Sequence, residues 1–360
     1  MEWDCLDVCW LQIATKSRCF WGLGMQQVSP ETVCVSVIIP TRNRAELVVK
    51  AVASALHQDF ESLEVIVVID GEDPRTREAL DAIFDPRVTV IDLAVSIGGA
   101  DARNVGVRAA RGEWVAFLDD DDEWLPHKLS RQMAVARRSG AAWPVLSSRM
   151  VVRTPGFELI RPLRSYQPEK PVSEFLFCRG SLKDGPFALQ TSTLLVRREL
   201  MLAVPFRSGL KRHQDWDWAL RVEQAIGVEF VVIDEPLVIY RAEDVRESVG
   251  RAQDWEFSMQ WGREMRPFFS AKAYSWFLAT ECASRAAKSR SGFRTYAEIL
   301  RRFVLDGQPS AGSAITMAVF LVLPSRWRRR VHHLIRRRRR GGVPHSLQRN
   351  DVQATIGMEF

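Results

Sequence analysis

The sequence predicts a doubly wound α/β domain, and three observations support this expectation. Continuous apolar runs alternate with helical stripes from residue 33 to Pro126, which is the pattern of a parallel sheet with helical crossovers. Polar residues directly follow three of the apolar runs, as expected where strands end at a ligand-binding crevice. The chain has 360 residues, of which 46% are hydrophobic and 26% charged, so it can bury a sizeable core.

The first elements follow one another in strict alternation. Continuous apolar runs predict buried strands at residues 33–40, 63–70, 87–93 and 114–122. Apolar residues at helical spacing predict helices between these strands, at residues 45–58, 76–84 and 100–110. A further helix should open at Pro126, because proline is tolerated in a first helical turn.

The second half of the sequence is less regular. Four prolines predict a loop over residues 153–171. A helix is expected at residues 214–226, and the chain should be mostly helical from residue 254 to about residue 303. Extended segments are expected at residues 187–196, 228–234 and 236–241.

These patterns divide the chain into four parts. We expect an N-terminal extension without fixed order at residues 1–30, the α/β domain at 31–250, a helical region at 251–325 and a disordered basic tail at 326–360. The tail dominates the net charge of +6, because residues 326–340 hold nine arginines and no acid, which leaves −3 for the rest.

The six cysteines include no C-x-x-C pair and no Cys/His cluster at zinc spacing. No signal-peptide pattern opens the sequence. We therefore expect reduced thiols and a cytoplasmic protein. Peripheral attachment to the inner face of the cell membrane is compatible with this location.

Four aspartates and a glutamate stand side by side at Asp119–Asp122 and Glu123. Adjacent carboxylates repel one another, and neither a helix face nor a strand ladder requires them. A divalent cation resolves this repulsion, because hard cations take carboxylate oxygens and then neutralise phosphates. The alternative is a solvated acidic turn that caps the next helix. The position of the run after a buried strand favours the metal.

Two further turns carry candidate ligand groups. Asp70 ends a buried strand and precedes a glycine, so it is either a turn aspartate or an acceptor for a base edge or a ribose. Residues 96–100 form a glycine-rich turn that opens a helix, a place that favours anions, although glycine pairs are also common in plain turns.

Gln214, Asp215, Trp216 and Asp217 begin an expected helix. An N-cap followed by first-turn acids explains them without any chemistry. The flanking tryptophans suit either a platform for sugar rings or ordinary core packing.

Several of these segments together resemble glycosyltransferase family 2, whose members have the GT-A fold of two abutting Rossmann-like halves in one sheet. The resemblance spans roughly residues 33–245 and is most specific at residues 98–129. The segments that carry it are VSVIIPTRNR (35–44), LEVIVVIDGEDP (63–74), GGADARNVGVRAARGEWVAFLDDDDEWLPHKL (98–129) and HQDWDW (213–218).

The resemblance implies a nucleotide-sugar site. Thr41 and Asp70 fall where the family contacts the nucleobase and the ribose, and a UDP-sugar is the donor that we favour. The implied binding residues are Pro40, Thr41, Asn43, Asp70, Arg103, Asn104, Asp119 and Asp120. The sequence departs from the family at Arg42, where a tyrosine is frequent, and at Ile69, where an aspartate is frequent; both departures concern the choice of nucleobase.

The resemblance also assigns the metal and the chemistry. Asp121, with Asp119, would hold Mg²⁺ or Mn²⁺, and Asp215 falls at the position of the general base of inverting members. His213, Gln214 and Trp216 are candidate contacts of the acceptor or the diphosphate, although a structural role is the favoured interpretation of His213. The acceptor would be a hydroxyl of a glycan or a lipid-linked sugar in cell-envelope or polysaccharide biosynthesis. Rival interpretations are a nucleotidyltransferase and a protein that binds nucleotide sugars without turnover.

The end of the sequence suggests an anionic membrane surface as a partner. Residues 314–323 are apolar and uncharged, and the arginine run follows Pro324. Ten apolar residues are too few to span a bilayer, but apolar residues beside arginines suit its surface. We therefore expect residues 314–340 to contact a membrane. The alternative is a last core helix with a disordered tail. No nucleic acid is expected, since no binding motif accompanies the run.

Overall fold

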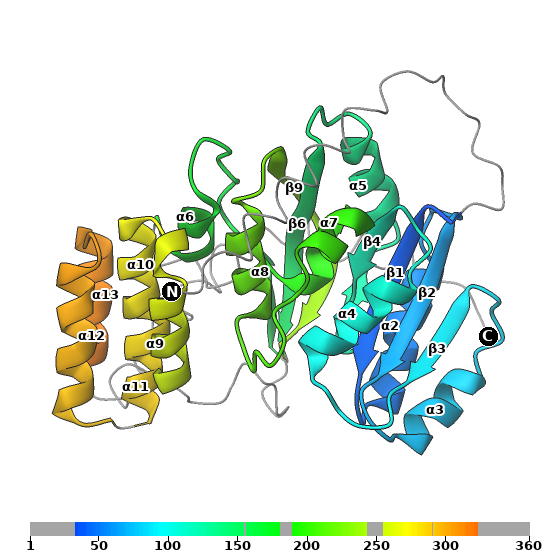
Figure 1. Ribbon diagram of the computed structural model, residues 1–360, viewed down its shortest axis with the longest axis horizontal. Coiled ribbons are helices and arrows are strands. Elements are labelled where there is room, and N and C mark those ends of the chain that lie inside the picture. Colours follow the sequence, from blue (N-terminus) through cyan, green and yellow to red (C-terminus); the bar gives the residue numbers. More distant parts are fainter. Residues whose placement is uncertain (1–32, 155, 181–188, 243–254, 290, 323–360) are drawn as a thin grey trace.

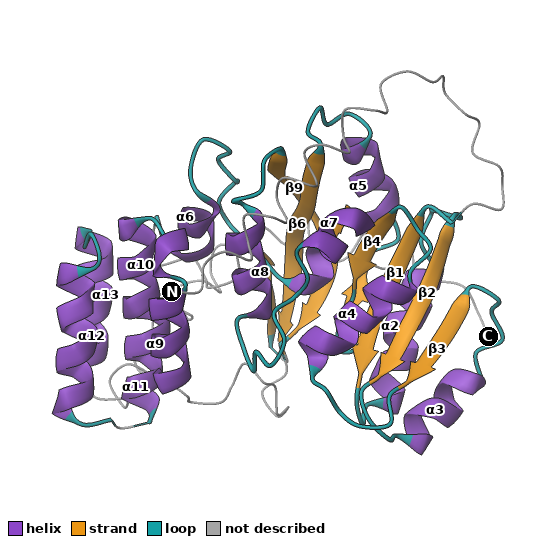
Figure 2. Cartoon of the chain, viewed as in Figure 1, coloured by secondary structure: helices purple, strands orange, loops and turns teal. Residues whose placement is uncertain are grey.

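The computed structural model describes residues 33–154, 156–180, 189–242, 255–289 and 291–322. A mixed sheet with helices on both faces forms one part of the molecule, and a bundle of helices from the end of the chain lies beside it (Figures 1 and 2). The expected extension at residues 1–30 and the tail at residues 326–360 lie outside the described residues.

The first half of the sheet is parallel. The strands are β1 (Val35–Thr41), β2 (Leu63–Ile69), β3 (Val88–Asp92) and β4 (Trp114–Phe117), and they lie in the order β3-β2-β1-β4. Strands β1 and β2 are buried along their whole length, which explains their continuous apolar sequences. Because all four strands run the same way, their carboxyl ends meet at one edge.

The second half makes the sheet mixed. Its strands are β5 (Glu123–Trp124), β6 (Trp143–Thr154), β7 (Phe157–Arg161), β8 (Leu195–Arg197) and β9 (Val228–Arg241). Strand β8 joins β4 in antiparallel fashion, and the order continues β8-β6-β9-β5 with β7 at the side of β6. The expected fold class is thereby confirmed.

Helices cover both faces of the sheet. Side chains of α2 (Ala45–Leu56), α3 (Pro74–Asp81) and α5 (Lys128–Ala136) join a core on one face. Side chains of α4 (Gly99–Ala109), α6 (Val172–Phe177), α7 (Arg198–Ala203) and α8 (Gln214–Val222) join a larger core on the other. The strands serve both cores by alternation, since Ile38 belongs to the second core and Val37 and Ile39 to the first.

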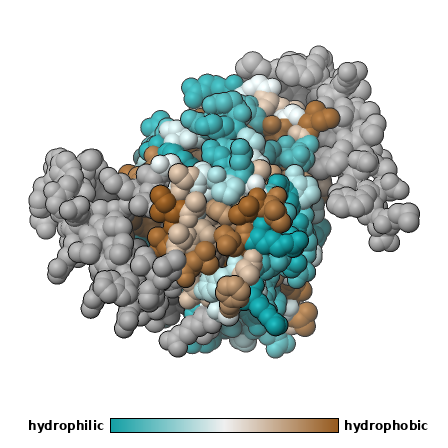
Figure 3. Space-filling view, turned by 90° about the vertical axis from the view of Figure 1, so that its left-hand side faces the viewer, coloured by the Kyte–Doolittle hydropathy of each residue, from teal (hydrophilic) through white to brown (hydrophobic). Residues whose placement is uncertain are grey.

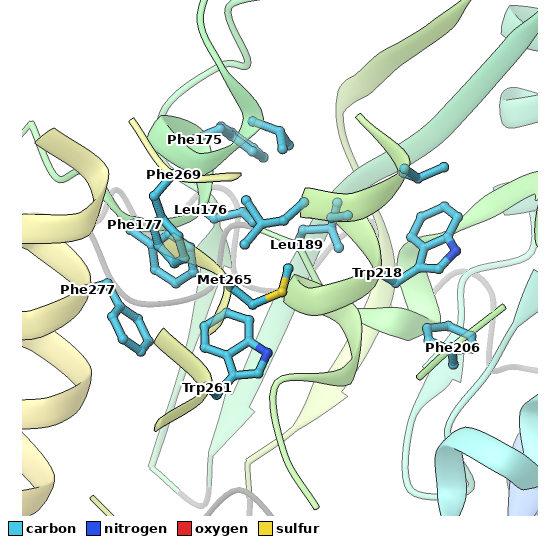
Figure 4. Packing of buried hydrophobic residues seen from close by; sticks show 14 of the residues in the cluster. Phe175, Leu176, Phe177, Leu189, Phe206, Trp218, Trp261, Met265, Phe269 and Phe277 are labelled. Atoms are coloured by element: carbon cyan, nitrogen blue, oxygen red, sulfur yellow. The ribbon is translucent and has the colours of Figure 1, made fainter. Parts of the chain in front are cut away.

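The last described elements extend the larger core. They are α9 (Trp255–Glu264), α10 (Ala271–Phe277), a π-helical turn (Leu278–Cys282), α11 (Ala283–Lys288), α12 (Phe293–Leu305) and α13 (Ala311–Val322). Their aromatic side chains interlock with those of α6 and α8, as the packing of Phe177, Phe269 and Phe277 around Trp261 shows (Figure 4). The predicted helical region is confirmed within the described residues. In these same stretches no helix is long and apolar enough to cross a bilayer.

Three expected elements have other bounds. The strand predicted at 114–122 ends at Phe117, and the backbone N–H of Asp119 donates to the hydroxyl of Ser192 rather than to a neighbouring strand. The helix expected at Pro126 begins at Lys128. The helix expected at 214–226 ends at Val222.

The predictions for the middle of the chain need more correction. Residues 153–171 are not one loop, because β7 pairs with the end of β6 as a hairpin. The two extended segments at 228–241 form the single strand β9, whose pairing with β6 shifts register on both sides of Pro236. In the segment predicted as extended at 187–196, residues Thr191–Thr193 form a 3₁₀ turn, and residues 187–188 lie outside the described part.

Candidate active site

The segment after β1 covers part of the acidic run. The hydroxyl of Thr41 donates to Oδ2 of Asp120 over 2.8 Å. Nη1 of Arg44 donates to Oδ1 of Asp120 (2.7 Å) and to Oδ2 of Asp121 (3.1 Å). Burial raises the pKa of Asp120, and the charge of Arg44 opposes that rise. These contacts follow from the parallel pairing of β1 with β4, which brings both carboxyl ends together.

A second segment supports the other two aspartates. Gln190 Nε2 donates to Oδ2 of Asp122 (2.8 Å) and to Oδ2 of Asp119 (3.1 Å). The hydroxyl of Ser192 donates to Asp122 and accepts from the backbone N–H of Asp119. Burial, and then the charges of Asp119 and Asp121, hold the pKa of Asp122 well above its ordinary range. Asp122 therefore has a structural role: its hydrogen bonds to Gln190 and Ser192 hold the acidic run in place.

The sequence analysis missed Gln190 and Ser192. The available signal was a polar Gln-Thr-Ser-Thr stretch inside an otherwise apolar segment, at residues 190–193. Such a stretch is buried in the structure, and buried polar groups require partners.

Arg103 joins the acidic run to the start of α8. Its Nη1 donates to Oε1 of Gln214 (2.9 Å), and its Nη2 makes a short ion pair with Asp119. The guanidinium lies close to the first turn of α4, where a Cβ at Gly99 would stand 3.3 Å from Nη1. The glycine-rich turn thus leaves room for the arginine that links the two regions.

Asp70 holds the glycine-rich turn in place. Its carboxylate accepts from the Ser96 hydroxyl (2.8 Å), the Ile97 N–H (2.6 Å) and the Gly98 N–H (3.0 Å). Gly71 and Gly98 have φ values of 101° and 91°, which glycine adopts without strain. The structure thus gives Asp70 a positioning role, and its contact with a nucleobase or ribose stays a prediction.

Two more predicted nucleotide ligands have structural partners. The backbone N–H of Asn43 donates to Oδ2 of Asp73 (2.6 Å), and Asp73 also caps α3. The amide of Asn104 makes two hydrogen bonds with the backbone of Phe206, at 2.8 and 3.0 Å. Asp73 was missed by sequence analysis, although an aspartate before the proline of a helix start is a capping signal. Pro40 belongs to buried β1, one residue before Thr41.

Asp215 lies in the first turn of α8, next to this network. One oxygen accepts from the N–H of Trp216 (2.9 Å). Burial raises the pKa of Asp215 to about 6, and the charge of Asp119 adds to the rise while Arg103 opposes it. Arg103, which bonds both Asp119 and Gln214, brings the start of α8 next to the acidic run.

The neighbours of Asp215 fix the helix that carries it. His213 is buried, adopts a left-handed backbone conformation (φ 65°), bonds Ser258 through Nε2 (3.0 Å) and stacks on Trp216. Burial holds the pKa of His213 well below its ordinary range, so the ring is neutral. The structure thus favours the structural role for His213. The expected acceptor or diphosphate contacts of Gln214 and Trp216 stay predictions.

Asp217 anchors the same turn from its other side. It is fully buried, pairs with Arg207 (3.1 Å) and Arg221 (2.8 Å), and accepts from the indole N–H of Trp261 (3.0 Å). Trp261 belongs to α9, so the helical region beyond the sheet holds the segment with Asp215.

Two carboxylates of the acidic run are partly open to solvent. The side chains of Asp119 and Asp121 are 25% and 22% exposed, and each pairs with an arginine. Within the described ranges no three His, Cys, Asp or Glu side chains are arranged to hold a metal by themselves. Mg²⁺ is typically bound by one or two carboxylates together with substrate phosphates, and the expected cation at Asp119 and Asp121 stays a prediction. A cavity of about 40 Å³ lies beside Asp120–Asp122.

Comparisons with known proteins agree with this geometry. The family described as glycosyl transferase family 2 matches residues 36–200. The amylovoran biosynthesis glycosyltransferase AmsB of Erwinia amylovora is 27% identical over 277 residues, which are 72% of this chain and 89% of AmsB. The UDP-Glc:alpha-D-GlcNAc-diphosphoundecaprenol beta-1,3-glucosyltransferase WfaP of Escherichia coli is 35% identical over 99 residues, 28% of this chain and 39% of WfaP.

The likeness extends to solved structures. The structure of Staphylococcus aureus TarS residues 1–349 in complex with UDP-GlcNAc matches with a TM-score of 0.51 and 19% identity, over 76% of this chain and 82% of that one. At this level of identity the match supports the fold alone, and it agrees with the GT-A architecture described above.

Proposed function

We propose a function from the family to which the chain belongs, glycosyltransferase family 2, whose match covers residues 36–200. The chain transfers a sugar, with inversion, from a nucleotide sugar to a hydroxyl acceptor in polysaccharide biosynthesis. One observation carries the proposal. Arg103 bonds both Asp119 and Gln214, so the acidic run and Asp215 adjoin at one edge of the sheet. A donor diphosphate at the first and an acceptor at the second would meet there.

The names of similar proteins support the substrate classes. TarS was solved with UDP-GlcNAc, and WfaP is named for a UDP-glucose donor and a diphosphoundecaprenol-linked acceptor. We therefore favour a UDP-sugar and a lipid-linked or growing glycan. A cytoplasmic enzyme at the inner face of the membrane would suit such an acceptor.

Asp119 and Asp121 would hold the divalent cation, whose chemistry there is to neutralise charge on the leaving diphosphate. Arg44 and Arg103 now pair with these carboxylates. We expect the same guanidinium groups to turn to phosphate oxygens when the donor binds, since arginine recognises both anions.

Asp215 would act as general base. An acceptor hydroxyl is far too weak an acid to ionise at neutral pH, so its proton must leave as the oxygen attacks. A carboxylate with a pKa of about 6 is ionised at pH 7 and more basic than an ordinary aspartate. Its place in the first turn of α8, fixed by His213 and Asp217, would keep its oxygen in position.

Release of nucleoside diphosphate from a panel of nucleotide sugars tests the proposal. We expect one donor to be hydrolysed slowly with Mn²⁺ or Mg²⁺, and chelator or Asp121→Ala to abolish the release. Asp92→Ala is the matched control, because this exposed carboxylate pairs with Arg77 at the far strand of the sheet.

Two results would count against it. Release that continues in chelator would refute the metal role of Asp121. Shifts in melting temperature with donors, but no release even with added acceptor extracts, would favour the rival function of a nucleotide-sugar-binding protein without turnover.

A further inference from the structure

Helix α12 has an apolar stripe that the bundle does not cover. Phe293, Leu300 and Val304 are 85%, 42% and 57% exposed, and Leu305 is 67% exposed. The spacing from Phe293 through Leu300 to Val304 keeps them on one side of the helix. Ile299 and Phe303 are buried against the bundle instead. The helix therefore has a second apolar side in addition to the one that the core requires.

This stripe forms one wall of a wide, shallow hollow between α12 and α13. The hollow has a volume of about 650 Å³. Figure 3 looks onto this end of the molecule and shows apolar side chains gathered in the middle of the face, with hydrophilic surface around them. The lining residues are Phe293, Tyr296, Ala297, Leu300, Arg301, Val304, Leu305 and Leu321.

Helix α13 itself is a component of the bundle. Ser313, Thr316 and Met317 are buried, and a Cβ at Gly312 would stand 2.9 Å from the ring of Trp276. The apolar segment at 314–323, which we expected to contact a membrane, thus packs against the bundle through Thr316 and Met317, whereas Ile315 is exposed. Its alternative, a last core helix, agrees with the structure. Helix α12 exposes more apolar surface than α13 does, with four large apolar side chains against Ile315 alone in the described part of α13.

The charges around the stripe indicate what covers it. Arg294 and Arg301 are exposed on α12 beside the apolar side chains, and Arg301 also lies 3.9 Å from a carboxylate oxygen of Glu298. Leu321 lines the hollow one residue before α13 ends, and the nine arginines of residues 326–340 follow in sequence. No acidic residue occurs between Gly307 and Asn350. Apolar side chains flanked by arginines match the surface of an anionic bilayer, which offers acyl chains below a layer of phosphates.

We propose that the exposed face of α12 lies on an anionic lipid bilayer, with Phe293, Leu300 and Val304 in the interface and Arg294 and Arg301 at the phosphates. A second copy of the chain fits this face less well, because it would bring two sets of arginines together. The chain's own tail carries the same sign of charge as Arg294 and Arg301 and is disfavoured for the same reason. The inference does not depend on the identity of the donor sugar.

Flotation of the full chain with vesicles tests the proposal. We expect binding to vesicles with 30% phosphatidylglycerol and little binding to pure phosphatidylcholine, since arginines near the surface favour anionic lipid. The double variant Leu300→Gln/Val304→Gln should lower the vesicle partition coefficient about tenfold or more, because two apolar side chains no longer leave water. Both side chains are exposed, so the melting temperature should not change.

The matched control is Phe84→Gln, which alters a 96% exposed apolar side chain between α3 and β3 and should bind as the wild type does. The proposal is overturned if the double variant floats like the wild type, or if the wild type binds neutral and anionic vesicles equally. It is also overturned if the wild type ignores vesicles but sediments as a dimer that the double variant dissociates. None of these readouts requires catalytic turnover, so failure of the proposed function would not affect them.

Discussion

Asp215 is the residue whose ionisation should set the pH dependence of the reaction. Burial raises its pKa to about 6, and Asp119 adds to this effect. A group with this pKa is about 90% ionised at pH 7 and protonated below pH 6. Only the ionised form can accept a proton, so activity should be present above the folded-state pKa and lost as the pH falls through it.

We predict that kcat at saturating donor falls about tenfold per pH unit below pH 6. Asp215→Asn should lower kcat at pH 7.5 by about 10²- to 10⁴-fold and remove this acid limb. Donor-induced melting shifts should persist, because the amide keeps the shape of the side chain. Rate profiles from pH 5 to 8 for both proteins provide the measurement.

Asp234→Asn is a suitable control, since this exposed carboxylate pairs with Arg149 away from the site. Near-normal turnover of Asp215→Asn would show that the base lies elsewhere. An acid limb that survives in a weakly active Asp215→Asn would assign the titration to another group, such as Asp120, whose pKa is also raised.

At the scale of elements, α4 has to approach the sheet closely to deliver Arg103. Gly106 allows this approach, because a Cβ there would stand 2.5 Å from Cγ2 of Ile38 on β1. Helix α4 would have to move outward to admit a methyl group. Such a movement would also shift Arg103, three residues earlier, away from Asp119 and Gln214.

We predict that Gly106→Ala lowers the free energy of unfolding by about 1–3 kcal/mol, even though alanine favours helix, because overpacking outweighs propensity at a buried contact. Urea denaturation measures this loss. Gly140→Ala is the control, since no atom lies within 4 Å of its added Cβ. Equal stability of the two variants would show that α4 adjusts without cost.

At the scale of the whole molecule, one core joins the sheet to the C-terminal helices. It runs from Ile38 and Phe117 on the strands through Trp218 to Trp261, Phe277 and Met317. The indole of Trp261 also bonds the buried Asp217, two residues from Asp215. The helical region therefore stabilises the turn that carries the candidate base, and we expect the two parts to unfold together.

We predict that Trp261→Phe lowers the free energy of unfolding by about 1–3 kcal/mol, because Asp217 loses one of its buried donors. It should also lower kcat, by up to about 100-fold if Asp215 moves by an ångström, with little change in the donor KM. Melting followed by tryptophan fluorescence and by residual activity should give one coincident transition.

Trp276→Phe serves as the control, because it removes an indole from the same core and leaves the hydrogen bonds of Asp217 in place. Equal effects of the two variants on kcat would mean that packing alone matters. Two separate transitions would mean that the helical region does not stabilise the site.

The sequence by itself determined the parallel half of the sheet and the gathering of candidate site residues at its carboxyl edge. Strands β1 and β2 and helices α2 and α4 were predicted within a few residues, because their apolar patterns reflect burial that the local period already specifies. Thr41 and Asp120 were both placed at the carboxyl edge, and the structure joins them by a hydrogen bond. This follows because adjacent parallel strands have their carboxyl ends at the same edge of the sheet.

The tertiary structure alone decided which side chains pair at that edge and what the neighbours of Asp215 do. Gln190 and Ser192 reach Asp122 from about 70 residues away, and Trp261 reaches Asp217 from 44 residues away. The local sequence pattern also did not predict the β6–β7 hairpin or the exposed apolar face of α12. The physical reason is the same in each case: a periodic sequence shows that a side chain is apolar or polar, whereas its partner is fixed only when distant segments pack together.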